Sequence, residues 1–503
     1  MGKKEFDQFR RLLIKTPLVA ASLMATTLSA SAKDKMLSSM GTNTHATSRV
    51  PSVSHTLLLK NADVVVTMDD KRREIKQGCV YIKGNTIVSV GTVKDVPQTA
   101  DRIIDLKGHI VIPGLINTHH HMYQSLTRAV PKAQDGELFN WLTTLYPIWE
   151  RLTPEMMKVA TKTAIAELML SGCTTSSDHQ YVYPNGIKLD HSIEAAQEMG
   201  MRFHACRGSM SVGKKQGGLP PDSIVEDEKF ILKDTQRVIE QFHDGRRGAM
   251  LRIVVAPCSP FSVSEQLMRE SAKLARSYKV SMHTHLAENV SDIEYSKKNF
   301  NKTPAQYVED LEWVGHDVWH AHCVKLDDYG MKLFARTGTG VAHCPCSNMR
   351  LGSGIAPVRH MLDCGMHVGL GVDGSASNDS SDMMTEVRQA LLLQRVGFGP
   401  QALTAREALE IATLGGAKNL NRDDVGALAP GMMADLAIFR LDSIAMAGAL
   451  HDPVAALVFC NPGKVAYTII NGRVVVEDGR VATIDVPVLI ETHNRLANTL
   501  AAG

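Results

Sequence analysis

Three consecutive histidines, at 119 to 121, follow an apolar segment that begins at Pro113. Such a segment is typical of a buried strand, and the histidines stand where that strand would pass into its loop. Because side chains alternate between the two faces of an extended chain, His119 and His121 point the same way and His120 points away. Two imidazoles on one face can bind one metal ion. The spacing therefore predicts a metal site.

Three more segments bring polar residues to the ends of apolar strands. His285 and Glu288 follow one strand, His322 follows the next, and Asp373 ends the apolar run that starts at Val368. His285 can add a third imidazole, and Glu288 lies near enough to act on a metal-bound water. Each residue alone could be a buried core residue or a helix cap. Four such signals at strand ends favour one shared site.

Three imidazoles and one carboxylate suit a single divalent transition metal. Zinc is expected first, with iron (Fe2+) or manganese as alternatives, because imidazole discriminates weakly among these ions. Such an ion lowers the pKa of bound water from about 15.7 to about 7, which makes hydroxide available at neutral pH. The residues therefore predict a hydrolytic site with one metal cofactor.

The strands that would position these residues alternate with longer helical patterns over residues 113–421, which indicates a parallel sheet with crossover helices. Thr153 before Pro154, and Thr404 with Glu407, mark helix starts. Eight units predict an α/β fold, a closed (β/α)8 TIM-like barrel with its chemistry at the carboxyl ends of the strands. The eight predicted strands are 111–117, 174–177, 202–205, 252–256, 280–283, 318–321, 340–342 and 368–371.

Both ends of the chain contribute short β-rich runs separated by turn signals. These runs lie in residues 56–112 and return in 422–485, where Asn471-Gly472 is typical of a hairpin turn. We expect the two segments to form one small β-sandwich of antiparallel strands. Residues 486–503 are expected to form a helical tail.

The first 55 residues differ from the rest. Arg10 and Arg11 precede a mildly apolar run, and residues 30–32 (Ala-Ser-Ala) form a small-residue cleavage site. Residues 1–32 therefore resemble a twin-arginine export signal, and the Ser/Thr-rich residues 33–55 resemble a linker. We expect a periplasmic or exported protein, or a cytoplasmic one if this segment is not a signal. The apolar run is too short for stable membrane insertion.

The composition is that of an ordinary globular protein. The chain is 44% hydrophobic and 21% charged, and 55 Lys and Arg against 53 Asp and Glu give a net charge of +2. With no basic stripe, we expect a small-molecule substrate and water, and no nucleic acid, as partners. Nine scattered cysteines favour buried thiols over disulfides or metal ligands. A homo-oligomer is allowed, although the sequence shows no interface.

Together the motifs resemble the amidohydrolase superfamily, in its branch of aminohydrolases that includes cytosine, guanine, methylthioadenosine and triazine deaminases. The resemblance extends from Leu57 to the C-terminus. It rests on Pro-Gly-Leu-Ile-Asn-x-His-x-His at 113–121, His-x-x-Glu at 285–288, Ala-His-Cys at 321–323, Gly-Val-Asp-Gly-x-x-Ser-Asn at 371–378 and Gly-x-x-Ala-Asp-Leu at 431–436.

The resemblance implies a role for each residue at the strand ends. One metal ion would be held by His119, His121, His285 and Asp373. Glu288 would shuttle protons, and His322 would polarise or orient the attacked group. Asp373 would also assist the attack and pass protons onward. The implied reaction is hydrolytic release of ammonia from an amino-substituted, purine-like heterocycle.

Loop sequences add a narrower resemblance, to deaminases of 8-oxoguanine. It is carried by residues 119–128, 138–152, 207–211, 217–221 and 347–351. In these loops Gln124 could contact a ring edge, Trp141 a ring face and Arg207 an oxo group. The resemblance implies 8-oxoguanine, converted to urate, as the substrate. An isoxanthopterin-like pterin or a hydroxy-s-triazine is the alternative, because an export signal is unexpected for purine salvage.

Three other functions fit the residues less well. Residues 369–374 have the Gly-x-Gly-x-x-Gly spelling of a dinucleotide site, but they fall in the last β/α unit and no acid follows about 20 residues on. The H-x-E and P-C-x-x-C motifs of nucleic-acid deaminases are absent. A non-catalytic binding protein on the same fold would not need a complete ligand set together with Glu288.

Overall fold

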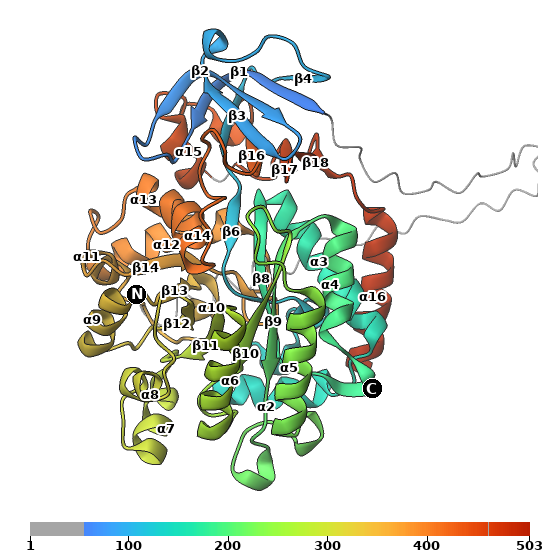
Figure 1. Ribbon diagram of the computed structural model, residues 1–503, viewed down its shortest axis with the longest axis vertical. Helices are drawn as coiled ribbons and strands as arrows, with labels where there is room; N and C mark the ends of the chain where they lie inside the picture. The colour runs from blue at the N-terminus through green and yellow to red at the C-terminus, as the bar shows by residue number, and fades with distance from the viewer. Residues whose placement is uncertain (1–54, 461, 503) are drawn as a thin grey trace, which may run out of the picture. The chain divides into compact units, whose positions relative to one another are not determined.

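The computed structural model describes residues 55–460 and 462–502. The predicted export signal and the predicted linker up to residue 54 lie outside the described residues. Two sheets organise the described chain: a closed barrel of eight parallel strands, and a nine-stranded sheet to which both ends of the chain contribute (Figure 1). The predicted fold class, a (β/α)8 barrel with a small β-sandwich domain built from both chain ends, is confirmed, and the strands of the small domain form one continuous mixed sheet.

The barrel closes in the order β10-β11-β12-β13-β14-β6-β8-β9. Each of its strands overlaps one of the eight predicted from the sequence. Their bounds are β6 (Leu115–Asn117), β8 (Cys173–Gln180), β9 (Arg202–Ser209), β10 (Leu251–Pro257), β11 (Met282–Leu286), β12 (Val318–His322), β13 (Gly340–His343) and β14 (His367–Leu370). All neighbouring pairs run parallel, so their carboxyl ends open on one face of the barrel.

The first predicted strand, 111–117, is divided between the two sheets. Its beginning belongs to β5 (His109–Pro113) of the nine-stranded sheet, and only β6 enters the barrel. Gly114 lies at the division, where an added Cβ would come within 2.1 Å of the Thr174 hydroxyl oxygen. The chain can therefore pass from one sheet to the other only because residue 114 carries no side chain.

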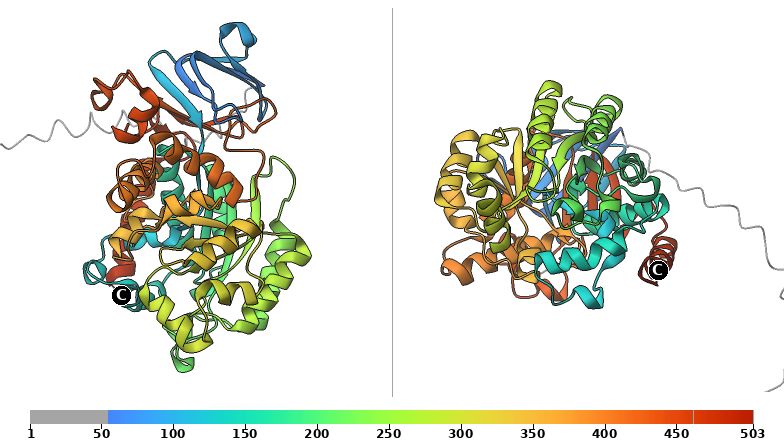
Figure 2. Two further views of the ribbon diagram at one scale, coloured as in Figure 1. Left: turned by 90° about the vertical axis from the view of Figure 1, so that its left-hand side faces the viewer. Right: turned by 90° about the horizontal axis from the view of Figure 1, so that it is seen from below.

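Helices surround the barrel strands (Figure 2). The Thr153 side chain caps α3 by accepting from the backbone N–H of Met156, and Thr404 and Glu407 form a capping box on α13, as predicted. The helices are α2 (Leu138–Trp149), α3 (Pro154–Leu170), α4 (Leu189–Met199), α5 (Glu228–Phe242), α6 (Glu265–Tyr278), α7 (Val290–Phe300), α8 (Pro304–Asp310), α9 (Asp328–Thr337), α10 (Pro345–Arg350), α11 (Val358–Asp363), α12 (Met383–Phe398), α13 (Ala405–Glu410), α14 (Gly416–Asn419), α15 (Pro453–Phe459) and α16 (Val486–Ala502).

The nine-stranded sheet has the order β19-β18-β17-β16-β5-β1-β2-β3, with β4 paired to β1. Antiparallel pairing of β5 with β16 joins the contributions of the two chain ends. The expected antiparallel pattern is incomplete, because β1 pairs in parallel with both β4 and β5. The remaining bounds are β1 (Thr56–Val66), β2 (Glu74–Lys83), β3 (Thr86–Gly91), β4 (Arg102–Asp105), β16 (Leu436–Arg440), β17 (Tyr467–Ile470), β18 (Arg473–Glu477) and β19 (Arg480–Val481).

Side-chain alternation divides the barrel residues between two cores. In β9, Cys206 packs inside the barrel with Ile116 and Trp319, whereas Phe203 and Ala205 pack outside against the helices. A further apolar cluster, built largely from α2 and the loops that follow the strands, contains Trp141 among other aromatic side chains. Inward and outward positions are therefore fixed along each strand, and with them the residues that can reach the carboxyl face.

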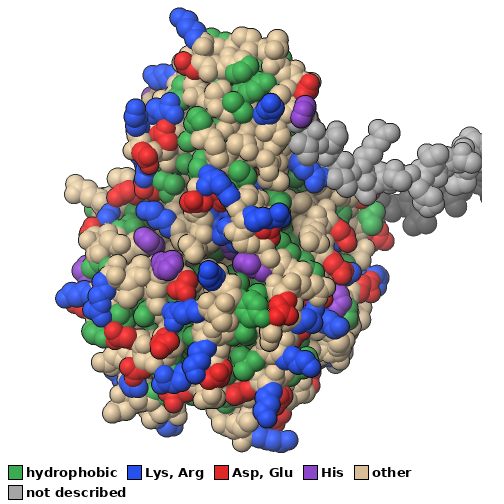
Figure 3. Space-filling model, in the orientation of Figure 1, with side chains coloured by type: hydrophobic (Ala, Val, Ile, Leu, Met, Phe, Trp, Pro, Cys, Tyr) green, Lys and Arg blue, Asp and Glu red, His purple; other side chains and the backbone are tan. Residues whose placement is uncertain are grey.

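Basic and acidic side chains are interspersed on the surface that Figure 3 shows. None of the helices in residues 55–460 and 462–502 has the length and apolar composition needed to cross a membrane.

Candidate metal centre and active site

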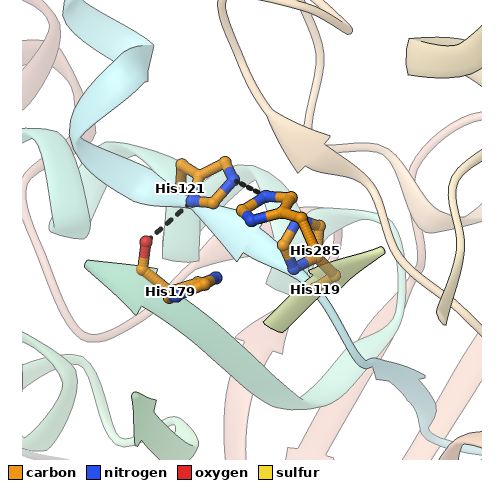
Figure 4. A group of neighbouring side chains, drawn as sticks. All are labelled: His119, His121, His179 and His285. Carbon is orange, nitrogen blue, oxygen red and sulfur yellow. Dashed lines mark hydrogen bonds between the residues drawn. The ribbon is translucent and has the colours of Figure 1, made fainter. Parts of the chain in front are cut away.

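Four imidazoles meet at the carboxyl end of the barrel (Figure 4). His119 and His121 follow β6, and His285 comes from β11. The ring of His120 points away, and its Nε2 lies 3.1 Å from the hydroxyl of Ser381. The fourth imidazole, His179 at the end of β8, was not singled out by the sequence.

Backbone and side-chain acceptors fix the tautomer of each of the three predicted histidine ligands. The Nδ1 of His121 lies 2.7 Å from the carbonyl oxygen of His179, and that of His285 lies 2.6 Å from the carbonyl oxygen of Cys258. A carbonyl can only accept, so Nδ1 carries the proton and Nε2 keeps its lone pair. Both lone pairs are therefore available to a metal ion.

His119 reaches the same state through a second histidine, His283. The Nδ1 of His283 lies 2.9 Å from the carbonyl oxygen of Trp319 and must donate to it. Its Nε2 is then an acceptor for Nδ1–H of His119, 2.7 Å away. The Nε2 of His119 is fully buried and has no hydrogen-bond partner. A buried imidazole nitrogen with a free lone pair is the donor that a metal ion requires.

The spacing of the ligand atoms fits one ion. Nε2 of His121 lies 3.1 Å from Nε2 of His285. Oδ1 of Asp373 lies 3.2 Å from Nε2 of His119 and 3.3 Å from Nε2 of His121. Ligands at zinc distances in a tetrahedron are about 3.3 Å apart. The structure therefore contains a His/Asp group able to hold a metal ion.

Two further histidines lie within reach of the same space, and their tautomers differ. Overlapping ligand groups can be drawn with His179 or with His322, each sharing His119 and His285. Nε2 of His179 lies 2.7 Å from the carbonyl oxygen of Ala256, to which it must donate, so its buried Nδ1, which has no partner, keeps a free lone pair. His322 is flanked by carboxylates, as described below, and serves better as a donor.

Burial keeps the site imidazoles neutral. It lowers the pKa of His121 to about 4 and holds the pKa of His119 well below its usual value. Burial alone would raise the pKa of Asp373, but its close contact with His119 and the other nearby histidines hold that pKa well below the ordinary value. Neutral imidazoles and an ionised carboxylate are the forms that bind a metal ion.

Glu288 and His322 stand together beside the ligand atoms. Oε2 of Glu288 lies 3.6 Å from Nε2 of His322, which is 3.9 Å from Oδ2 of Asp373. Nδ1 of His322 accepts from the side-chain amide of Asn348 at 3.0 Å. With two carboxylates facing it, Nε2 of His322 must carry the proton, so this residue is a hydrogen-bond donor. Its tautomer is the opposite of that in the three predicted ligands.

Burial, together with the neighbouring carboxylate of Asp373, raises the pKa of Glu288 well above its usual value. Its Oε1 is buried and has no hydrogen-bond partner. A carboxyl group with a raised pKa and a free oxygen can take up a proton and release it again, which suits a general acid and base.

Asp373 is held through both oxygens. Its Oδ2 accepts from the hydroxyls of Ser347 at 2.5 Å and Ser377 at 3.1 Å, while Oδ1 accepts from the backbone N–H of Gly374 at 2.7 Å. These contacts turn Oδ1 toward His119 and His121 and leave Oδ2 next to His322.

The strands end abruptly at these positions. Ala287, His322, Cys323 and Asp373 have φ values of 51°, 70°, 51° and 60°. Residues other than glycine rarely adopt this left-handed conformation, and where they do so they often belong to functional sites. Here it turns the chain at the carboxyl ends of β11, β12 and β14.

A cavity that opens to solvent lies over the metal group. The polar end is formed by His121, His285, Glu288, His322 and Asp373. No Lys or Arg lines the cavity, so within the described chain any oxo group of a ligand must be bound by neutral donors or by the metal. The apolar walls are Leu138, Trp141, Leu142, Tyr146, Phe261 and Leu351.

The three predicted substrate contacts have different positions. Gln124 and Trp141 line the cavity, and the indole N–H of Trp141 donates to the carbonyl oxygen of Ala376 at 3.0 Å. Arg207 does not line it. The expectation that Arg207 contacts an oxo group is therefore wrong. Arg207 follows the inward-facing Cys206 in β9, and because side chains alternate along a strand, it points outward.

Arg207 is fully engaged by other residues. Its guanidinium lies 2.8 Å from Asp234 and 2.9 Å from Glu226, and it stacks on the ring of Tyr183 at 4.0 Å. The two carboxylates belong to α5 and to the loop before it. Arg207 therefore ties that loop to the barrel.

Sequence reasoning missed His283, Ser347, Ser377, Asn348 and Tyr181. A signal existed for His283, which is spaced two residues from His285 and so shares its face of β11. Ser377 belongs to the motif at 371–378, and Ser347 and Asn348 belong to the loop 347–351, but these patterns did not indicate which side chains they contact.

Known proteins share this arrangement. The model of the amidohydrolase family matches residues 110–475. The 8-oxoguanine deaminase of Pseudomonas aeruginosa is 44% identical over 428 residues, which are 85% of this chain and 95% of that protein. An isoxanthopterin deaminase from an unknown prokaryotic organism is 36% identical over 449 residues, 84% of this chain and 92% of that one.

Among solved structures, atrazine chlorohydrolase from Arthrobacter aurescens TC1, complexed with zinc, superposes with a TM-score of 0.84 and 33% identity. The match covers 88% of this chain and 100% of the other. These similarities confirm the family resemblance that the motifs indicated.

Proposed function

We propose that this chain, which belongs to the amidohydrolase family, is a metal-dependent deaminase. It releases ammonia from 8-oxoguanine by hydrolysis. One observation carries the proposal: three bare imidazole nitrogens and a carboxylate oxygen converge beside a protonatable Glu288 and a donating His322. A group that binds metal and also contains a proton carrier suits hydrolysis better than a purely structural role.

A single zinc ion is the proposed cofactor, held by His119, His121, His285 and Asp373. The ligand types support zinc, and the structure of a zinc-containing relative superposes on this chain. Bound there, the ion would supply hydroxide at neutral pH, because coordination lowers the pKa of water to about 7.

The protein's own residues would manage the protons. Glu288 takes one proton from the attacking water and delivers it to a ring nitrogen of the substrate. His322 donates a hydrogen bond through Nε2 to the charge that develops on the ring. Oδ2 of Asp373 takes the second proton and passes it to the departing amino group. A carbon–oxygen bond forms, the carbon–nitrogen bond breaks, and the products are ammonia and urate.

The cavity supports a flat, neutral heterocycle. Its walls are aromatic and aliphatic, and no Lys or Arg side chain lines it. The relative with 44% identity deaminates 8-oxoguanine according to its name, which makes this compound the first choice. Isoxanthopterin is the second candidate, since the relative named for it also matches most of the chain. A hydroxytriazine is the third, through the likeness to atrazine chlorohydrolase.

An ammonia-release assay tests the proposal. Zinc-reconstituted protein is incubated with 8-oxoguanine, guanine, isoxanthopterin and hydroxytriazines, and 8-oxoguanine is expected to give the highest kcat/KM. Glu288→Gln should keep its zinc and lose about 10² to 10⁴ of kcat, as expected for removal of a general acid and base. The control is Glu294→Gln, an exposed position in α7, which should remain fully active.

Two results would contradict the proposal. Release of ammonia from none of the compounds by the zinc-loaded protein would exclude the deaminase. Full activity of Glu288→Gln would exclude the proton transfer assigned to this residue.

A further inference from the structure

Gln124 and Tyr181 stand side by side in the cavity wall. Gln124 lies in the short helix η3 (Met122–Thr127) after β6, and Tyr181 follows β8 directly. Both side chains line the cavity, and both are almost completely buried, at 0% and 3% exposure. The ring of Tyr181 meets the ring of His121 edge to face, with centroids 4.9 Å apart.

The amide of Gln124 has hydrogen-bonding capacity to spare. Its Nε2 lies 3.5 Å from the hydroxyl of Tyr181, at the limit of a hydrogen bond, and both side chains also interact with the hydroxyl of Tyr123, but its Oε1 has no partner. A buried acceptor without a partner costs about 1 to 3 kcal/mol, so such groups are usually satisfied by a ligand or water. The amide also lies directly over Gly374, where an added Cβ would come within 1.8 Å of Oε1. Glycine at 374 is what allows the amide to occupy this place.

These two side chains lie across the barrel from Glu288 and His322. Gln124 and Tyr181 follow β6 and β8, which are neighbours, and Glu288 and His322 follow or end β11 and β12, which are also neighbours. Around the closed barrel, β9 and β10 lie between β8 and β11, and β13 and β14 lie between β12 and β6. The two strand pairs therefore face each other across the barrel. A flat ligand bound between the pairs would show one edge to Glu288 and His322 and the opposite edge to Gln124 and Tyr181.

We infer that Gln124 and Tyr181 form a second recognition edge that binds a ring lactam, an adjacent N–H and C=O, on the side of the substrate opposite its amino-bearing carbon. Oε1 of Gln124 accepts from the ring N–H, and the hydroxyl of Tyr181 or Nε2 of Gln124 donates to the oxo group. This inference rests on the proposed function and adds the feature by which the site selects its substrate.

The chemistry of the candidate substrates fits two such edges. In 8-oxoguanine the amino-bearing carbon belongs to the six-membered ring, and the oxo group at C8 forms a lactam at the far end of the five-membered ring. Guanine has the same amino-bearing carbon but no oxo group at C8. A site that hydrogen-bonds this lactam discriminates against an analogue that lacks it, because buried polar groups are then left unpaired. The pair 8-oxoguanine and guanine therefore isolates the contribution of the edge.

The experiment compares the two substrates in Tyr181→Phe, which removes the hydroxyl and keeps the ring against His121. The ratio of kcat/KM for 8-oxoguanine over that for guanine should fall about tenfold, the loss of one neutral hydrogen bond, mainly through a higher KM. Bound zinc should not change. The matched control is Tyr183→Phe, whose hydroxyl donates to the carbonyl oxygen of Gln180 outside the cavity and whose ratio should equal that of the wild type.

Binding gives the same comparison without turnover. Hypoxanthine and 8-oxohypoxanthine carry no amino group, so their competitive inhibition constants report recognition alone. Tyr181→Phe should weaken the 8-oxo compound about tenfold relative to hypoxanthine. Should Tyr181→Phe lose zinc, Gln124→Met decides the question by the same ratios, since it removes the amide and keeps a side chain of similar length.

The outcomes separate this inference from the proposed function. The second recognition edge would be overturned if a variant lost kcat/KM equally for 8-oxoguanine and guanine and inhibitor affinity equally for 8-oxohypoxanthine and hypoxanthine. It would also be overturned if neither variant lost either quantity. Both results would leave the proposed deaminase activity intact. A wild-type protein that releases ammonia from no heterocycle would overturn the proposed function itself, and the inhibition ratios would still report whether the edge binds a lactam.

Discussion

Replacing His283 by leucine should weaken metal binding although His283 is not itself a ligand. His283 accepts from Nδ1–H of His119 and so leaves Nε2 of His119 bare for the ion. In the variant that donor has no acceptor. Metal-free His119 can move its proton to Nε2 and donate to Asp373, 3.2 Å away, but binding the ion would force the proton back to the unpaired Nδ1.

The expected cost follows from this proton. An unpaired buried donor costs about 1 to 3 kcal/mol, and here the cost falls on the metal-bound state. We therefore expect a roughly 10- to 100-fold weaker zinc affinity, the range usual for partners of metal ligands. His283→Gln should retain most of the affinity, because its amide oxygen can accept from His119 while its NH2 group donates to Trp319.

The assay is a titration of metal-free protein with zinc against a competing chelator, with thermal unfolding measured in parallel. The control is His320→Leu: His320 is equally buried in the neighbouring strand but interacts with Trp313 and stacks on Phe334 of α9. His320→Leu should bind zinc like the wild type. A zinc affinity of His283→Leu within twofold of the wild type, or an equal loss in His320→Leu, would refute the assignment of the proton on His119.

Three further predictions follow from other parts of the chain. Arg207→Gln should leave KM nearly unchanged and lower the free energy of unfolding in urea by about 3 kcal/mol, because largely buried Glu226 loses its cationic partner and Asp234 keeps only Arg237; a large rise in KM with unchanged stability would restore Arg207 as a substrate contact. Burial raises the pKa of Glu386 to about 8, so the folded state holds this proton more tightly than the unfolded state and stability falls as the pH rises from about 4.5 to 8. Glu386→Gln should lack this component, so its melting temperature relative to the wild type should increase across that window and level off above it; parallel profiles would contradict the shift. We also propose export through the twin-arginine pattern: Arg10→Lys with Arg11→Lys should retain the full-length protein in the cytoplasmic fraction of cells, and unchanged fractionation would argue against it.

The amino-acid sequence determined the elements and the main chemistry of the site. Alternation along an extended chain is a local rule, so His119 and His121 could be assigned to one face and His120 to the other before any tertiary contact was known. The number of strand and helix patterns likewise predicted the barrel, because each pattern depends on residues close together in the chain. Strand-end residues such as Glu288 and Asp373 then followed from the rule that parallel strands share one carboxyl face.

Only the tertiary structure decided how those residues are used. The same alternation that placed His119 turns Arg207 outward, but recognising this required the register of β9 relative to its helices, which depends on contacts between distant segments. The proton positions on the ligands depend on carbonyls of Cys258 and Trp319 from other strands. The pairing of Gln124 with Tyr181, like the contact of Ser347 with Asp373, joins loops separated by tens of residues. Local sequence patterns carry no record of such contacts, because they arise when the barrel closes and brings the ends of its strands together.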